Sequence, residues 1–153
     1  GSSEKGCSCA PSQVARYQSK VSGPMLDRID LQVRMDRPKA EEVLTGSNDP
    51  LDCTEVVRDR IGRARAVAVE RQGCINSELN SAVLTTVRAT RDTLSLLRRS
   101  SDQLSLSPRA ITRALKVARS IADLTGCMDL QPEHLAEAFD LRTLEWGSLS
   151  CAY

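Results

Sequence analysis

The sequence predicts a mostly α-helical fold: a bundle of about four to five helices, preceded by one short helix and one strand. Aromatic residues make up only 3% of the 153 residues, so the core must be built from Leu, Ile, Val and Ala. Such a core favours helix packing over a β-sandwich. Apolar residues also recur at helical spacing along much of the chain, between residues that typically start and stop helices.

The N-terminal part predicts a short helix over residues 13–20, which the sequence Ser22-Gly-Pro24 ends. The run Leu31-Gln-Val-Arg-Met35 alternates apolar and polar residues, which is typical of a half-buried strand. This strand should end by Asp36, because Pro38 has no N–H to donate to a neighbouring strand. A loop-like composition follows, and we expect a linker over residues 38–51.

A long helix is predicted from Asp52 to Gly73. Asp52-Cys-Thr-Glu55 has the form of a capping box, and Gly73 suits the position just after the helix. We expect an apolar stripe on this helix at Val56, Val57, Ile61, Ala64, Val67 and Ala68. The region from residue 76 to 104 predicts two shorter helices, with core positions at Leu79, Val83, Leu84, Leu94, Leu97 and Leu104.

The clearest helix covers residues 108–125. Ser107 caps it, Pro108 takes its first position and Gly126 stops it. Its apolar arc is wide enough to require contact with at least two other helices. The opposite side carries Arg109, Arg113 and Lys116. A last helix should begin at Pro132 and continue to about Leu144, with inward residues Leu135, Ala138 and Phe139.

Composition narrows the classes of function. The net charge is +1, from 21 basic and 20 acidic residues, which argues against a nucleic-acid binder that works by bulk charge. No apolar run approaches the ~18 residues of a membrane span, and the N-terminus has no secretory pattern. We therefore expect a cytoplasmic protein without membrane partners, whose six cysteines are reduced.

For two kinds of side chain, a structural role is the simpler interpretation than a functional one. His134 is the only histidine, and no nucleophile stands near it in the sequence, so we expect a surface residue rather than a catalytic base. The arginines of the first long helix alternate with acidic residues. A solvated face with i,i+4 ion pairs is the default interpretation, and a DNA-tracking face is the alternative. These arginines are Arg58, Arg60, Arg63, Arg65 and Arg71.

Arg28 is the first candidate for chemistry. It stands where a short helical turn meets the strand-like run, between Asp27 and Asp30. A rigid junction can direct a planar, permanently charged guanidinium at phosphate oxygens. The alternative is an ion pair with one or both of the neighbouring acids.

Three segments carry a family resemblance. Ser22-Gly-Pro-Met-Leu-Asp-Arg-Ile-Asp30 resembles a segment of the magnesium-chelatase-like AAA+ ATPases, in their ComM group. The run from Leu106 to Leu124 resembles the lid helix of that family, and Glu133-His-Leu-Ala-Glu-Ala138 is a third match. The matches follow the family order and span residues 7–143.

The resemblance implies roles for three arginines. Arg28 would be the finger that reaches the ATP of a neighbouring subunit, where such a group is worth about 10³–10⁵ in rate. Arg109 would be the sensor that touches the γ-phosphate of its own subunit, and Arg113, one turn further on, is the alternative for that role. Arg109 stands in the first turn of its helix, where free N–H groups favour an anion.

The resemblance also implies the domain organisation. Residues 1–10 would be a flexible tail and residues 11–37 the edge of an α/β AAA+ core. After the linker, residues 52–146 would form the helical lid, and residues 147–153 a second tail. The chain has no phosphate-binding P-loop and no strand that ends in an acidic pair. It should therefore not hydrolyse ATP alone, and ATP and Mg²⁺ would be held by the longer parent protein.

The implied partners are the rest of the AAA+ core and neighbouring subunits of a homo-oligomeric ring. Two activities are possible within the family: a motor that moves branched DNA, and ATP-driven insertion of Mg²⁺ into a porphyrin. The residues of the motifs favour the DNA motor. A stand-alone helical interaction or nucleic-acid module is the alternative from another class.

A metal site is not expected. The family has a Cys-x-Cys where this chain has Cys7 and Cys9, and a second cysteine pair that this chain lacks. Two thiolates cannot complete the tetrahedral coordination of Zn²⁺. Further ligands would have to come from Cys53, Cys74 or another chain.

Overall fold

The computed structural model describes residues 9–26, 28–33, 35, 38–45, 53–80 and 87–142. These ranges contain seven α-helices and one 3₁₀ helix, and they contain no strand. The helices are α1 (Pro11–Gln18), α2 (Gly23–Leu26), α3 (Ala40–Thr45), α4 (Thr54–Gln72), η2 (Asn76–Glu78), α6 (Arg91–Gln103), α7 (Pro108–Leu124) and α8 (Pro132–Asp140). The prediction of a mostly helical fold is confirmed.

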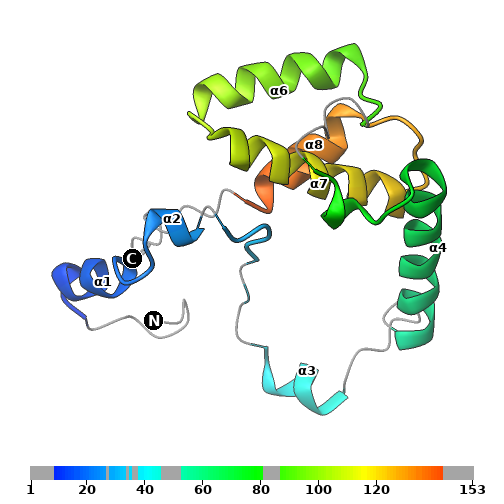
Figure 1. The fold of residues 1–153 in the computed structure, drawn as a ribbon. Helices are drawn as coiled ribbons and strands as arrows, with labels where there is room; N and C mark the ends of the chain where they lie inside the picture. Colours follow the sequence, from blue (N-terminus) through cyan, green and yellow to red (C-terminus); the bar gives the residue numbers. More distant parts are fainter. Residues whose placement is uncertain are drawn as a thin grey trace.

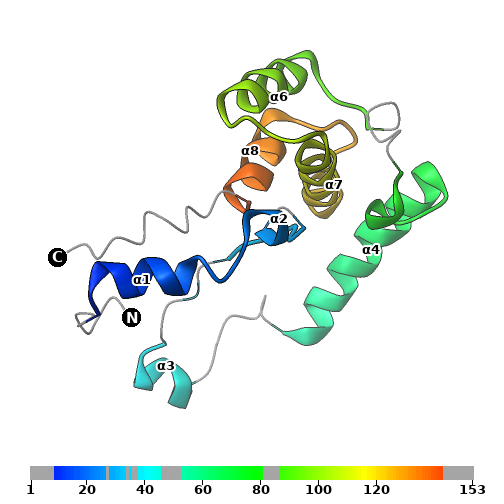
Figure 2. The same cartoon turned by 60° about the vertical axis from the view of Figure 1, so that its left-hand side comes forward.

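The C-terminal helices form the bundle, and α7 is its centre (Figure 1). Among the described elements, α7 packs against α8, α4 and η2, while α6 packs against α8. The wide apolar arc of α7 is therefore shared between several partners, as the sequence predicted. In both views α3 lies well apart from α6, α7 and α8 (Figures 1 and 2).

The ends of α7 follow from local sequence. Ser107 Oγ accepts a hydrogen bond from Ala110 N at 3.1 Å, and Pro108 stands at the first helical position. After Leu124 the chain turns at Gly126, whose φ of 75° is easily adopted only by glycine. Gly73 ends α4 in the same way, with φ 77°. These caps and stops are as predicted.

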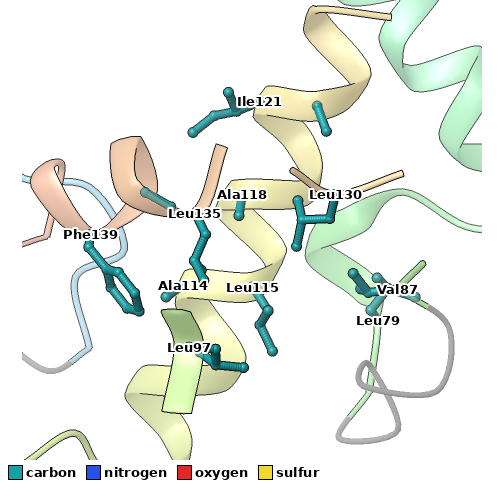
Figure 3. Close-up of a cluster of buried hydrophobic side chains, with 12 residues drawn as sticks. Leu79, Val87, Leu97, Ala114, Leu115, Ala118, Ile121, Leu130, Leu135 and Phe139 are labelled. Atoms are coloured by element: carbon teal, nitrogen blue, oxygen red, sulfur yellow. The ribbon is translucent and has the colours of Figure 1, made fainter. Parts of the chain in front are cut away.

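The core lies between α6, α7, α8 and the segments that connect them (Figure 3). Ala114, Leu115 and Ala118 of α7 are buried, and small alanines let neighbouring helices approach closely. Leu130, fully buried, belongs to a short extended piece that forms a parallel bridge with Ala89. The other buried apolar residues of the cluster are Leu79, Val87, Leu97, Ile121, Ala122, Leu135, Ala138 and Phe139.

The predicted strand at residues 31–35 is wrong. Residues 31–33 and 35 are described and form no strand, and Leu31, Val33 and Met35 are exposed. An alternating pattern produces a strand only when a second strand supplies the ladder hydrogen bonds. None of the described residues does so, and Gln32 N donates instead to Leu141 O at 2.6 Å.

The predicted apolar stripe of α4 is also wrong, because only Ala68 of this helix is buried. The valines and Ile61 of that stripe are exposed. Ile61, Ala64 and Ala68 line a depression between α4 and the end of α7, so this side of the helix faces α7 but is only partly covered by it. The helix begins at Thr54 with Cys53 as its N-cap, while Asp52 lies outside the described residues.

Two further boundaries differ from the prediction. Of the first of the two short helices expected after Gly73, residues 76–78 form a 3₁₀ turn, η2, and the expected core positions Val83 and Leu84 lie outside the described residues. The second is α6, as predicted. The last helix ends at Asp140 rather than at about Leu144. The division into tail, core edge, linker and lid stays a prediction.

Candidate functional site: an arginine turn held on the helical bundle

The turn that carries Arg28 is built by α2 and the two residues after it. Met25 N and Leu26 N both donate to Ser22 O, which starts the helix directly after the Gly-Pro break. Arg28 N then donates to Met25 O at 3.0 Å and ends it. The Arg28 side chain is exposed, and its Nη1 donates to Pro24 O at 2.6 Å.

The ion pair between Arg28 and Asp30, the alternative to a role in chemistry, does not form, because Asp30 binds another arginine. Arg113 Nη1 lies 2.5 Å from Asp30 Oδ1 and also donates to the carbonyl oxygen of Arg28. A pair of Arg28 with Asp27 lies outside the described residues. The structure thus joins two of the three candidate arginines, Arg28 and Arg113, through the backbone of one of them.

Two more contacts hold this segment on the bundle. Arg142 Nη1 donates to Ile29 O at 3.4 Å, and Gln32 N donates to Leu141 O. The Oε1 atom of Gln32 is buried and accepts no hydrogen bond from any residue that the structure describes. Residues 28–32 therefore lie against α7 and the end of α8, mainly through hydrogen bonds.

Arg109 lies apart from these contacts, in the first turn of α7. It lines an open depression of about 370 Å³ together with Leu79, Asn80, Pro108, Thr112, Arg113 and Lys116. Its guanidinium is exposed and forms no ion pair or hydrogen bond with the described part of the chain. Lys116 is held by Ser77 O at 2.8 Å. The depression is cationic, and Arg109 keeps its hydrogen-bond donors available.

A buried charge network, which the sequence analysis missed, joins α4, η2 and α7. The side chains of Arg119 and Asp123 are each only 1% exposed, and they form an i,i+4 pair at 2.9 Å. Arg71 binds both carboxylate oxygens of Asp123, at 2.6 and 3.0 Å, and Asn76 Nδ2 donates to Oδ2 at 2.7 Å. Arg71 was expected on a solvated face and is instead one of the two arginines that bind Asp123.

The remaining donors of the network are also satisfied. Arg119 Nη1 donates to Met128 O at 2.7 Å, and Nη2 donates to Cys127 O. Burial would raise the pKa of Asp123, but the hydrogen bonds from Arg71 and Asn76 and the charges of both arginines outweigh it, so this pKa lies below its usual range. Burial lowers the pKa of Arg119, although Asp123 opposes this, and a guanidinium remains charged at neutral pH. This arrangement fixes α4 on α7.

His134 is buried, so the expectation of a surface histidine is wrong. It is the third residue of α8, where its Nδ1 accepts a hydrogen bond from Gln131 N at 3.2 Å. Its Nε2 lies 3.2 Å from Thr125 Oγ1. The imidazole therefore caps the helix, a role that Glu or Gln commonly takes at this position.

The other arginines of α4 are exposed, as expected. Arg58, Arg60, Arg63 and Arg65 form none of the anticipated i,i+4 ion pairs within the described residues. Cys7 lies outside those residues, and Cys9 and Cys53 are exposed. The described ranges bring no three His, Cys, Asp or Glu side chains together in a way that could hold a metal ion. None of their helices combines the length and apolar character that a membrane crossing requires.

Comparison with known proteins gives matches along nearly the whole chain. The family model for the C-terminal part of magnesium chelatase subunit ChlI matches residues 52–142, and the model for magnesium chelatase subunit ChlI matches residues 1–43. Competence protein ComM of Haemophilus influenzae is 36% identical over 137 residues, which are 88% of this chain and 26% of that protein.

Two further relatives are similar in extent. The protein YifB of Escherichia coli K12 is 33% identical over 138 residues, 90% of this chain and 27% of its own. A protein of Mycobacterium bovis is 35% identical over 141 residues, 89% of this chain and 27% of its own. The chain thus spans about a quarter of the length of the curated relatives that it matches. Since the larger family match alone extends over more than half of its residues, the chain belongs to the magnesium chelatase ChlI family.

Proposed function

We propose that this chain is the lid portion, with the adjoining edge of the core, of a ring-forming AAA+ ATPase. In this proposal Arg28 acts on ATP held by a neighbouring subunit, and Arg109 senses ATP held by its own subunit. The complete protein supplies the nucleotide-binding core and the Mg²⁺ site. The conformational change of the lid would drive work on DNA.

One observation carries the proposal: Arg109 presents an uncompensated guanidinium at the N-terminal end of α7. Its neighbours in the depression are Arg113 and Lys116, whose donors are partly used by Asp30 and by Ser77 O. Helix N-termini and guanidinium groups both favour phosphate oxygens. This availability favours Arg109 over Arg113 as the residue that meets the γ-phosphate.

The first test removes Arg28 in the complete protein. Arg28→Ala should lower the ATP turnover of assembled rings by a factor of about 10³ or more and leave nucleotide affinity nearly unchanged. Arg98→Ala is the matched control, because Arg98 is an exposed arginine on α6 and takes part in none of the hydrogen bonds that hold this turn. Normal turnover in Arg28→Ala rings, with full assembly, would remove Arg28 from the catalytic site.

The second test concerns the sensor. Arg109→Ala should weaken ATP-dependent closure, measured as a loss of ATP affinity and of turnover together. Unchanged affinity and turnover would leave the sensor role to Arg113 or to no arginine of this chain.

DNA is favoured as the substrate because α4 exposes Arg58 and Arg65 on one side and Arg60 and Arg63 on another, without ion pairs among the described residues. Arginines placed in this way can contact phosphates in a salt-dependent manner. The resemblance of the motifs to the ComM group, which implies a DNA motor, points in the same direction. The assay compares branched DNA with porphyrin and Mg²⁺ as stimulators of ATP turnover. Stimulation by porphyrin alone would favour the chelatase alternative, which the name of the family model suggests.

A further inference from the structure

Arg113 occupies a place that neither a finger nor a sensor explains. It lies on α7, one helical turn after Arg109, but its Nη1 atom points to the preceding segment of the chain. That one nitrogen serves both the carbonyl oxygen of Arg28 and Asp30 Oδ1, at 2.5 Å in the second case. The partners are 85 and 83 residues away in the sequence, so this contact is tertiary.

The geometry of the contact makes Arg28 dependent on α7. The carbonyl that Arg113 holds belongs to Arg28 itself, and the guanidinium of Arg28 is bound to Pro24 O only four residues earlier. The Arg28 side chain is thus bound to the short turn that precedes it. The same turn is bound to α7 at its last residue, through the carbonyl oxygen of Arg28. A displacement of α7 at this point must move the turn or break the hydrogen bonds.

The charge of Arg113 is also paired, with that of Asp30. Its side chain is 29% exposed and that of Asp30 is 54% exposed, so the pair lies at the surface and can exchange partners. Arg109, by contrast, has no partner in the described part of the chain. Of these two arginines of α7, Arg109 therefore lines the depression with its donors available, and Arg113 binds the turn.

We propose that Arg113 is a positioning residue that connects the state of the lid to the finger. ATP in the subunit that contains Arg109 moves α7, and Arg113 transmits this movement to the backbone of Arg28, which acts on the next subunit. The inference rests on the proposed function and adds to it a route from one nucleotide to the next. If Arg113 instead touched the ATP of its own subunit, its loss would harm that subunit alone.

Mixed rings separate these two roles. Arg113→Ala subunits of the complete protein are combined with subunits that bind ATP but cannot hydrolyse it, and whose Arg28, Arg109 and Arg113 are intact. At some interfaces the Arg113→Ala subunit holds ATP and the other subunit provides a normal Arg28. Such an interface is active if Arg113 works through Arg28, and inactive if Arg113 serves its own ATP.

We expect homomeric Arg113→Ala rings to lose at least about tenfold in kcat with little change in KM, because positioning of a finger acts on the chemical step. In equal mixtures, random assembly gives about a quarter of the interfaces the active composition, so turnover should return to about a quarter of wild type. Arg28→Ala subunits should regain activity in the same mixture, and Arg109→Ala subunits should not.

A second variant approaches the contact from its other side. Asp30→Asn removes the ion pair without altering α7, and it should give a smaller loss of kcat that the same mixture restores. Failure of both Arg113→Ala and Asp30→Asn to regain turnover, while Arg28→Ala does, overturns this inference and leaves the proposed function intact. Normal turnover in homomeric Arg28→Ala rings overturns both.

Discussion

The carboxylate of Asp123 should be the most sensitive point of the helical bundle, and Asp123→Asn tests this. Five hydrogen bonds reach this one group, two from Arg71, two from Arg119 and one from Asn76. The asparagine keeps the size of the side chain but removes its charge. Two guanidinium groups, one of them fully buried, then remain without a counterion.

The expected magnitude follows from the burial of the pair. Breaking a buried ion pair by removing one partner costs about 3–5 kcal/mol, since the remaining charge is uncompensated. Arg71 is 18% exposed and can recover some hydration, so the lower end, about 3 kcal/mol, applies. A domain of ordinary stability, about 5–15 kcal/mol, would lose a large part of it.

Urea unfolding of the chain, followed by circular dichroism, measures the effect. With a slope of about 2 kcal/mol per molar urea, the midpoint should fall by about 1.5 M. Asp129→Asn is the matched control, because its pair with Arg88 at 3.1 Å is largely exposed and worth at most about 1 kcal/mol. The double change Arg119→Met with Asp123→Leu should be less harmful than Asp123→Asn, because it leaves only Arg71 unpaired. Equal, small shifts for Asp123→Asn and Asp129→Asn would refute the assignment of a buried network.

Three more predictions concern the stability of the chain. The lowered pKa of Asp123 means that its contribution is complete above about pH 4, the ordinary value for Asp, and is lost as the pH falls through the lower folded-state value; urea midpoints from pH 7 to 3 should fall more steeply for the wild type than for Asp123→Asn. Gly73→Ala should lower the free energy of unfolding by about 1 kcal/mol, because its φ is 77°. Gly62→Ala, inside α4 with nothing within 4 Å of a new Cβ, should raise it by up to about 1 kcal/mol. Thermal unfolding compares the two variants, and changes of the same sign would contradict this prediction. His134→Ala should lower stability by about 1 kcal/mol, and His134→Gln, which can accept the same hydrogen bond from Gln131 N, should recover much of it in chemical denaturation; equal losses would argue against the cap.

Local signals were enough to predict some elements. The serine cap, the first-position proline and the final glycine each act within one helical turn, so α7 could be located from its own sequence. The strand at residues 31–35 failed because a strand depends on a neighbour that the alternation cannot reveal. The stripe of α4 failed for a related reason, since a sequence pattern does not state how much of a helix face its packing partner covers.

The candidate site could be predicted only in part. Arg28 and Arg109 were identified from motifs, and the structure places both at the surface. The bond from Arg113 to Asp30 joins residues 83 positions apart, and no local rule predicts such a pair. A usable signal did exist for the buried network: Arg119 and Asp123 interrupt the apolar arc of α7 at i,i+4 spacing beside Ala118 and Ala122. Charges in such a position must be paired.

The attachment of residues 28–32 to the bundle depends little on their side chains. Of the four hydrogen bonds that join it to described residues of the bundle, three use peptide atoms of the segment, namely Arg28 O, Ile29 O and Gln32 N, and one uses the side chain of Asp30. Exchanging the side chain of Ile29 or Leu31 leaves every one of these bonds possible. Adding or deleting a single residue would shift each peptide group away from its partner, so the spacing of this segment is under tighter constraint than its composition.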